Sequence, residues 1–510
     1  MQTLFESIDL AGRTCLAWLN HDRDYLPTGG YEAAHDTGRW WDAMLRREAV
    51  TGLPIPAEFE GPMLRNLQRL TDNPDGLLMK LPDQPDLPLT VNPHNFREAM
   101  IAFHALVRYR NNAWAAKQGH RLLETIDRIL QEDGRIDYTL LQTKKVSDDP
   151  FVAQPAPGEW CDSTASLGRS LEGIVWFYEA TGDPLALRVA ERIASHQRAS
   201  ILTADGSLRP ELIDPEHVGH SHSFLGTLRG LLLFGFLTRQ RAYIDAVACT
   251  YRQSVRRYIV TETGYVAHDL GKIRHPNKDG IPVGEHASCG DAIQLALWLA
   301  LRDGQLDLLD DVERWMRACI LPSQITERFP EAQDPRKFGA WGVYIDPYGI
   351  DSTHDVFAAV LHSVTDVYAH VVTHDTRGLA VNLLFSADGD TASVRVEYGT
   401  EFASVTVTPK VRDNVLIRVP GWAPRESVTL SVDTRPVEAF WIGPYLFIGR
   451  DTLALGNRIT LTYALPERSS SETMRNGKNY RFTWRGDQVV ASDPPTTIYP
   501  TSQSDSVTMF

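Results

Sequence analysis

The chain has 510 residues, of which 43% are hydrophobic and 23% charged, and its formal net charge is −14. This is the composition of a globular protein, and its acidic balance argues against a nucleic-acid or anionic-membrane partner, because such partners need a basic face. The five cysteines are scattered and form no CxxC pair, so neither a disulfide framework nor a standard zinc motif is expected. We expect a cytoplasmic protein, because the first twenty residues do not resemble a signal peptide and no stretch approaches the ~20 apolar residues of a membrane span.

Up to residue 370, apolar residues recur at helical spacing between Pro- and Gly-rich connections, as in Leu122, Leu123, Ile126 and Ile129. Twelve helical segments are predicted, beginning near residues 4, 36, 57, 94, 113, 166, 184, 221, 240, 285, 305 and 353. The even-numbered segments follow one another at intervals of 55 to 72 residues, so a helical hairpin repeats six times. This repeat predicts an (α/α)6 barrel over residues 1–370, in which inner and outer helices alternate.

After residue 371 the hydrophobic pattern changes to the period of two that is typical of strands. The predicted strands are 380–385, 393–398, 404–408, 415–419, 428–432, 445–448 and 458–463. They predict an antiparallel β-sandwich over residues 371–468, and with the barrel an α+β fold class. Residues 469–510 are rich in Ser, Thr, Pro and Asn, and we expect a C-terminal extension that packs on the surface, with a disordered end from residue 501.

The starts of the even-numbered helices share histidine, arginine, tryptophan and carboxylate side chains that the odd-numbered starts lack as a combination. Helix capping explains Asp36 and Asn95, but it does not explain the histidines and arginines. In an alternating ring these six starts point to one end of the barrel, so we expect them to line a pocket. Indole faces together with imidazoles and carboxylates suit a sugar ring, whose CH faces stack and whose hydroxyls need hydrogen-bonding partners.

Several short motifs resemble the β-L-arabinofuranosidase superfamily of glycoside hydrolases, that is, glycoside hydrolase family 127 and its distant relatives. Residues 168–183 follow that family's Gly-His-x-x-Glu…Tyr-x-x-Thr-Gly pattern, and residues 218–220 and 285–288 resemble its Gly-His and Glu-x-Cys-Ala-Ser stretches. Residues 276–277, 381–383, 416–423 and 484–489 resemble further family signatures. The resemblance implies a six-hairpin barrel with a β-sandwich behind it and hydrolysis of a glycosidic bond.

The departures from the family pattern fall at chemically important positions. The family uses a zinc-bound cysteine nucleophile in a Cys-Cys pair at the last inner helix, and the matching positions here are Asp351 and Ser352. Arg169 replaces the family's sugar-binding histidine. The cysteine–zinc mechanism therefore does not carry over, and we expect no metal and no other cofactor.

Glycosidic hydrolysis without that cysteine needs two carboxyl groups, one as acid and one as nucleophile or base. The candidate catalytic residues are Glu285, Asp351, Asp355 and His286, with Asp291 and Asp36 behind them. Asp351 stands in the register of the family nucleophile, although a plain helix N-cap explains it equally well. For Glu285 the alternative is a first-turn residue that interacts with the helix dipole.

The candidate substrate-binding residues form a longer set. They are Arg169, His220, His222, Trp160, Asp36, Arg39, His94, His354, Trp341 and Tyr344. Arg169 suggests a carboxylate on the substrate, because a guanidinium binds carboxylates bidentately, although pairing with Asp162 or Glu172 would make it structural. For Trp341 and Tyr344 the alternative to sugar stacking is packing under the β-domain. The histidines and carboxylates also admit a metal site, but no motif spacing supports one.

The sequence therefore predicts an exo-acting glycoside hydrolase for a small oligosaccharide that ends in a uronic acid or a pentofuranose. An oligosaccharide lyase for uronates and a catalytically inactive sugar-binding relative are the alternatives. The expected partner is a small carbohydrate, with no nucleic acid and no membrane, and a homo-oligomer is left open. Fold alone does not choose among these functions.

Overall fold

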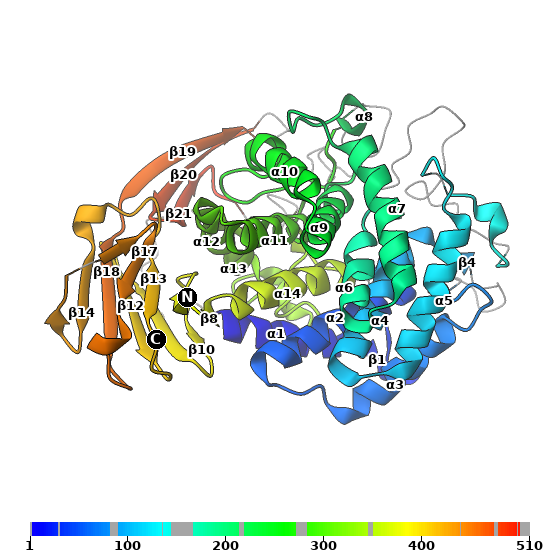
Figure 1. The fold of residues 1–510 in the computed structure, drawn as a ribbon, viewed down its shortest axis with the longest axis horizontal. Helices are drawn as coiled ribbons and strands as arrows, with labels where there is room; N and C mark the ends of the chain where they lie inside the picture. Colours follow the sequence, from blue (N-terminus) through cyan, green and yellow to red (C-terminus); the bar gives the residue numbers. More distant parts are fainter. Residues whose placement is uncertain are drawn as a thin grey trace.

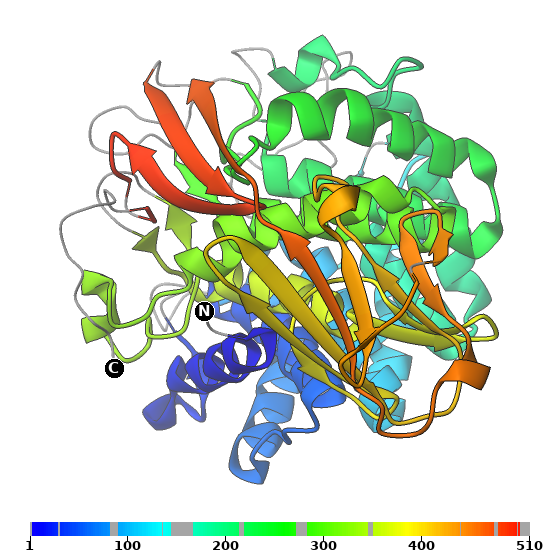
Figure 2. The same cartoon turned by 90° about the vertical axis from the view of Figure 1, so that its left-hand side faces the viewer.

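The computed structural model describes residues 3–28, 31–81, 90–134, 136–143, 167–213, 219–271, 283–344, 350–438, 440–473, 478–496 and 498–499. In these ranges a helical region is followed by β-sheets that cover one side of it (Figures 1 and 2). None of the described helices is long and apolar enough to cross a bilayer.

Six helices form a closed inner ring. They are α2 (Ala33–Thr51), α4 (Phe96–Arg110), α6 (Leu171–Thr181), α9 (Ser221–Thr238), α11 (His286–Asp303) and α14 (His354–Ala369). Each packs against the next, and α14 packs back on α2, which closes the ring. Their sequences explain the inner position, because residues on every face of α9 and α11 are buried. At one close approach, a Cβ on Gly38 of α2 would lie 2.5 Å from the carbonyl oxygen of Glu98 on α4.

The outer helices are amphipathic and alternate with the inner ones. They are α1 (Leu4–Ala17), α3 (Ala57–Leu70), α5 (Ala113–Ile129), α7 (Pro184–Ile201), α10 (Arg241–Thr250) and α12 (Leu309–Trp315). The π-helical segments η5 (Tyr251–Ile259) and η7 (Met316–Ile320) extend α10 and α12, and α8 (Pro210–Ile213) and α13 (Leu321–Ser323) are short. Each helix start lies within five residues of its prediction, so the barrel prediction is confirmed.

Two sheets form the β-sandwich. One has the order β10 (Ala387–Asp388), β11 (Ala392–Tyr398), β12 (Phe402–Pro409), β18 (Ile459–Ala464), β14 (Thr429–Val432) and β15 (Arg435–Pro436). The other has the order β16 (Phe440–Ile442), β17 (Tyr445–Ile448), β13 (Val415–Arg418), β9 (Gly378–Val381) and β8 (Val372–Asp375). All pairs are antiparallel except β9 with β13, and alternate residues of both sheets, among them Val405 and Ile417, share one buried core.

A third sheet corrects one expectation. The segment expected as a C-terminal extension that packs on the surface contains β19 (Glu467–Thr473), β20 (Asn479–Arg485) and β21 (Gln488–Asp493), which pair antiparallel. Its buried side chains Tyr480, Phe482 and Trp484 belong to the same apolar cluster as the helical core. These aromatic residues alternate with polar ones, which is the strand signal that the Ser- and Thr-rich composition concealed. Residues from 500 onward, including the end predicted to be disordered, lie outside the described residues.

Short strand pairs shape the loops near the inner helices. They are β1 (Leu19–Asn20) with β2 (Leu26–Pro27), β3 (Met79–Lys80) with β4 (Thr90–Val91), and the three-stranded set β5 (Gly284–Glu285), β6 (Val343–Tyr344) and β7 (Ile350–Asp351).

Buried ion pairs join the barrel to the sandwich. Arg418 on β13 contacts Asp310 and Glu313 of α12, both at 2.6 Å, and its side chain is 1% exposed. Arg317 of η7 contacts Asp487 in the turn after β20 and donates to the carbonyl oxygen of Leu384. These contacts fix the sandwich against the outer layer of the barrel.

We expect Arg418→Ala to lower the free energy of unfolding by about 3 kcal/mol, because it removes the cation that pairs with the partly buried Asp310 and one of the two arginines that contact the buried Glu313. Urea unfolding followed by circular dichroism measures the change. Lys410→Ala is the control, since Lys410 pairs with Asp388 at the exposed edge of the same domain and should contribute less than about 1 kcal/mol. Equal losses for the two variants would contradict the role given to Arg418.

Candidate active site

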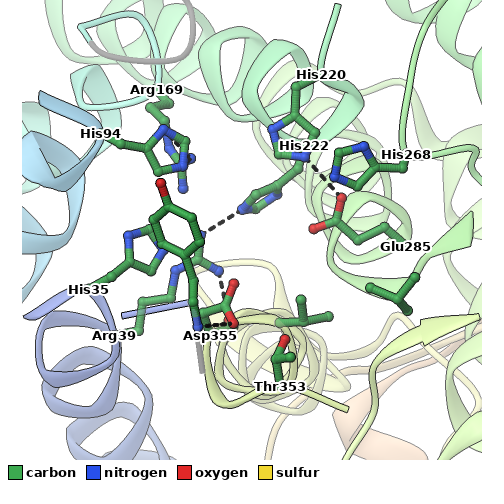
Figure 3. Close-up of a pocket in the computed structure, with 13 residues that line it drawn as sticks. His35, Arg39, His94, Arg169, His220, His222, His268, Glu285, Thr353 and Asp355 are labelled. Carbon is green, nitrogen blue, oxygen red and sulfur yellow. Dashed lines mark hydrogen bonds and ion pairs between the residues drawn. The ribbon is translucent and has the colours of Figure 1, made fainter. Parts of the chain in front are cut away.

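A pocket of about 260 Å³ lies at the N-terminal end of the inner helices (Figure 3). Its lining residues are Tyr31, His35, Arg39, His94, Arg169, His220, His222, His268, Glu285, Val343, Thr353, Asp355 and Val356. All six inner helices contribute, from their first two turns or from the two residues before them. This is the convergence that the alternation of the helices predicted.

The structure brings seven of the predicted site residues together in this pocket. They are Arg39, His94, Arg169, His220, His222, Glu285 and Asp355. Sequence reasoning did not select Tyr31 or His268, because both lie in connections rather than at helix starts. Tyr31 is 42% exposed, and its ring lies edge-on to His35 and His94 at 5.2 and 5.7 Å between centroids. It therefore places an aromatic ring at the pocket rim.

Asp351 requires a correction. It pairs with Val343 across β6 and β7, and because Ile350 beside it is buried, strand alternation turns Asp351 outward. Its side chain is 60% exposed and contacts Lys337 Nζ at 3.1 Å. It does not line the pocket, so it is not placed to act as the nucleophile there.

Four other predicted residues lie behind the pocket instead of lining it. Trp341 is fully buried and donates from Nε1 to the carbonyl oxygen of Ile320 at 2.7 Å, so its ring is not available for stacking on a sugar. His286 contacts the carbonyl oxygen of Gly342 through Nδ1 at 2.6 Å. Asp36 and His354 are fully buried and lie 4.0 Å apart, measured from Oδ1 to Nδ1. Trp160 lies outside the described residues, as does the side chain of Tyr344.

Glu285 is the most buried of the carboxylates that line the pocket. It caps the start of α11, and both His220 Nε2 and Ser288 Oγ donate to its Oε2, at 3.1 and 3.3 Å. Figure 3 shows its other oxygen directed toward the centre of the pocket. Burial alone would raise the pKa of Glu285, but the interaction with His220, which donates a hydrogen bond to it, and the nearby His268 hold it well below its usual value. Glu285 is therefore an anion at neutral pH, as a nucleophile or general base must be.

Asp355 is the second carboxylate of the pocket. It lies in the first turn of α14 and is half-buried. Its Oδ1 accepts the backbone N–H of Tyr31 at 3.3 Å, and its carbonyl oxygen accepts Arg39 Nη1 at 2.8 Å. These contacts tie the pocket rim to the starts of α2 and α14.

Four buried arginines and three buried carboxylates form what we call the inner-wall cluster. Its members are Arg39, Arg97, Glu98, Arg169, Glu172, Arg229 and Asp291. Glu98 alone contacts Arg39, Arg97 and Arg169, at 3.1, 3.3 and 2.9 Å. Arg169 therefore pairs with Glu98 and not with Glu172. The cluster has one more cation than carboxylate.

The histidines around this cluster are neutral. Burial holds the pKa of His35, His94 and His222 well below the usual value, and nearby guanidinium groups lower the pKa of each further. His222 contacts Asp291 Oδ2 through Nδ1 at 2.6 Å, and its Nε2 lies 2.9 Å from Arg39 Nη2. Since an arginine only donates, Nδ1 carries the proton and Nε2 accepts. His222 thus braces Arg39 and does not offer a proton to a substrate.

Two arrangements bear on a metal. At the positions that correspond to the family's cysteine pair, Asp351 faces solvent and Ser352 Oγ donates to the carbonyl oxygen of Trp341 at 2.7 Å, so these residues do not fit a thiolate zinc site. His220, His268 and Glu285 each place one candidate ligand atom within 4.8 Å of the others. The two imidazoles are stacked, however, with planes 27° apart, so their in-plane lone pairs run side by side and do not converge on one point. This geometry favours hydrogen bonding over coordination.

We expect stability to fall below pH 6.5, because His354 is buried as a neutral ring and burial lowers its pKa to about 3. The unfolded chain takes up this proton near pH 6.5 and the folded chain does not, so the loss is about 1.4 kcal/mol per pH unit. His354→Leu should flatten the change in urea stability between pH 7.0 and 5.5 by about this amount. His21→Leu, at an exposed site, should leave the change as it is, and an unaltered slope in His354→Leu would contradict the prediction.

No protein-family model matches the sequence, and no curated protein matches it. Solved structures do match the fold over nearly the whole chain. A family 127 β-L-arabinofuranosidase from Geobacillus stearothermophilus T6 is 14% identical with a TM-score of 0.56, covering 95% of this chain and 80% of that one. A protein described as a glycoside hydrolase is 14% identical with a TM-score of 0.60, covering 96% and 81%. Another family 127 β-arabinofuranosidase is 14% identical with a TM-score of 0.58, covering 95% and 78%.

The fold is therefore that of a six-hairpin glycosidase barrel followed by antiparallel β-sheets. The fold is similar to that of the family 127 β-L-arabinofuranosidases. This confirms the architecture that the sequence motifs implied.

Proposed function

We propose that the protein is a glycoside hydrolase that removes one terminal sugar from a small oligosaccharide by carboxylate chemistry. The observation that carries the proposal is the pair of carboxylates, Glu285 and Asp355, that line one pocket, with Glu285 held as an anion. Hydrolysis of a glycosidic bond needs a group that protonates the leaving oxygen and an anionic carboxylate that acts as nucleophile or base, and Glu285 fits the second role. Similarity of fold to glycoside hydrolases supports the same reaction class.

The size of the pocket supports action at the end of a sugar chain. Its volume of about 260 Å³ lies below the roughly 300–1,000 Å³ of sites for drug-sized ligands and suits a single sugar ring. Tyr31 at the rim offers the aromatic face, and His94 and Arg169 on the wall offer polar partners. A single residue bound here would be the terminal one.

The wall of the pocket supports an acidic sugar in preference to a neutral pentofuranose. The inner-wall cluster has an unbalanced positive charge, and the adjoining histidines add none because they are neutral. Arg169 is 1% exposed, and its Nε has no hydrogen-bond partner among the described residues. Burial lowers its pKa only to about 10, so it remains a cation at neutral pH. A substrate carboxylate would balance this charge.

We expect kcat/KM for p-nitrophenyl glucuronide or galacturonide to exceed that for the neutral arabinofuranoside by about 10- to 100-fold, the usual effect of a hydrogen bond to a charged group. Release of p-nitrophenol at pH 7 measures both. Arg169→Gln should reduce this preference, while Arg198→Gln, on the outer helix α7, should retain it. Turnover of the neutral substrate alone would contradict the acidic-sugar proposal, and an unsaturated product absorbing in the ultraviolet would indicate a lyase.

We expect Glu285→Gln to reduce kcat by at least about 10³-fold, because the amide cannot act as nucleophile or base. Asp351→Asn should retain turnover, since its carboxylate faces solvent. The same p-nitrophenyl assay compares the two variants, with circular dichroism to establish that both are folded. Full activity of Glu285→Gln, or loss of activity in Asp351→Asn alone, would reverse the assignment.

A further inference from the structure

We propose that His268 is the proton donor to the leaving group in this pocket, and that Asp269 is the residue that positions it. The inference rests on the proposed glycosidase function and assigns a role that the carboxylate pair leaves open. It concerns a residue outside the helix starts, in the extended segment between η5 and α11.

The backbone holds His268 rigidly between two inner-helix starts. Its carbonyl oxygen accepts the N–H of Ser221 at 2.9 Å, at the start of α9, and its N–H donates to the carbonyl oxygen of Val283 at 2.9 Å, just before α11. An isolated bridge pairs Asp269 with His220, and another pairs Ala267 with Gly284. The imidazole is therefore fixed at the pocket by hydrogen bonds on both sides.

The ring is oriented by a carboxylate. His268 Nδ1 lies 3.0 Å from Asp269 Oδ1, and the carboxylate of Asp269 is buried. A carboxylate that accepts from Nδ1 fixes the orientation of the ring and stabilises its protonated form. Nε2 is then the nitrogen through which His268 acts on a substrate in the pocket that it lines.

The neighbouring charges favour a proton on His268 and disfavour one on His220. The charged and titratable groups that face His268 among the described residues are Asp269 on its own segment, His220 at α9, Glu285 at α11 and Asp355 at α14. Burial lowers the pKa of His268, but the hydrogen bond to Asp269 and the charge of Glu285 raise it above the usual value. Burial and the adjacent His268 lower the pKa of His220 to about 4. In the stacked pair, whose centroids lie 4.3 Å apart, the proton is thus favoured on His268 over His220.

Figure 3 shows His268 and Glu285 on the same side of the pocket, with His220 next to both. Two adjoining groups, His268 and Glu285, can therefore supply the acid and the anion that hydrolysis needs. Nε2–H of His268 gives its proton to the glycosidic oxygen while the bond from that oxygen to the anomeric carbon breaks, and the electron pair stays on the oxygen. Glu285 accepts a proton from the attacking water while the water oxygen forms its bond to the anomeric carbon. That oxygen becomes the new hydroxyl group, and return of the proton from Glu285 to His268 through solvent restores both groups, so the atoms and charges balance.

The decisive experiment varies the leaving group. On the sugar that the wild type accepts, His268→Asn should reduce kcat/KM by about 10²- to 10⁴-fold for a poor leaving group such as methyl or 4-methoxyphenyl, which needs protonation. For the 2,4-dinitrophenyl glycoside, whose leaving group departs as the anion, the loss should stay below about 10-fold. His374→Asn is the matched control, because His374 on β8 forms a similar pair with Asp413, and neither residue lines the pocket.

Asp269→Asn provides a second test that keeps the imidazole. It should move the alkaline limb of the kcat/KM profile to lower pH by about one unit, since the carboxylate no longer stabilises the protonated ring. NMR of ¹⁵N-labelled histidine should show the same decrease in the pKa of His268, and this readout needs no substrate.

Failure of the proposed function and failure of the proton-donor assignment give different results. If the wild type cleaves none of the glycosides, the proposed function fails while the NMR result still reports on the His268–Asp269 pair. The assignment of the proton donor is overturned if His268→Asn lowers kcat/KM equally for the poor and the good leaving group. It is also overturned if Asp355→Asn, and not His268→Asn, lowers kcat/KM mainly for the poor leaving group. Stoichiometric Zn²⁺ binding that His268→Asn abolishes, measured by calorimetry with the metal alone, would also overturn it in favour of coordination.

Discussion

The arrangement of the arginines in the pocket wall depends on the ion pairs of one buried carboxylate, that of Glu98. Its Oε1 contacts Arg39 from α2, Arg97 from its own helix and Arg169 from the turn before α6. Neither Glu98 nor Arg169 is appreciably exposed, and burying such charges costs several kcal/mol for each ion unless partners compensate. Glu98 therefore links three successive inner helices at the level of the pocket, close to the point where Gly38 lets α2 approach α4.

This network also determines which pocket groups carry charge. Burial and the guanidinium groups that pair with Glu98 lower the pKa of His94 and His222, so these imidazoles serve as neutral hydrogen-bonding groups. On the opposite wall the carboxylates of Asp269, Glu285 and Asp355 reverse this effect at His268. The pocket thus has one wall with arginines and an opposite wall with Glu285, His220 and His268. A sugar bound between them would present its carboxylate to one wall and its glycosidic bond to the other.

The barrel and the convergence of its helix starts could be predicted from the sequence alone. Helical periodicity and the spacing of the hairpins are local patterns, and burial of the apolar faces favours the same arrangement. The sequence was insufficient wherever partners come from distant segments. The pairing of Arg169 with Glu98 joins positions 71 residues apart, and nothing in the local pattern selects Glu98 over Glu172. His268 was missed because an extended connection has no helical period, although the adjacent pair His268-Asp269 was a usable signal. The strands of the third sheet were missed because polar residues dominate their exposed faces.

The prediction that Asp351 lines the pocket was wrong for a physical reason. Counting register from the family motif assumes that the segment before the last inner helix keeps its conformation, but here β7 pairs with β6, which turns Asp351 outward and leaves Ser352 bonded to the backbone of Trp341. The same three-stranded set contains Glu285 at the end of β5, where the chain turns into α11 and the side chain enters the pocket. One strand of this set therefore ends at a buried carboxylate, Glu285, that lines the pocket, and another ends at an exposed carboxylate, Asp351, that does not. The acid–base chemistry that we propose accordingly lies on the α9–α11 side of the pocket.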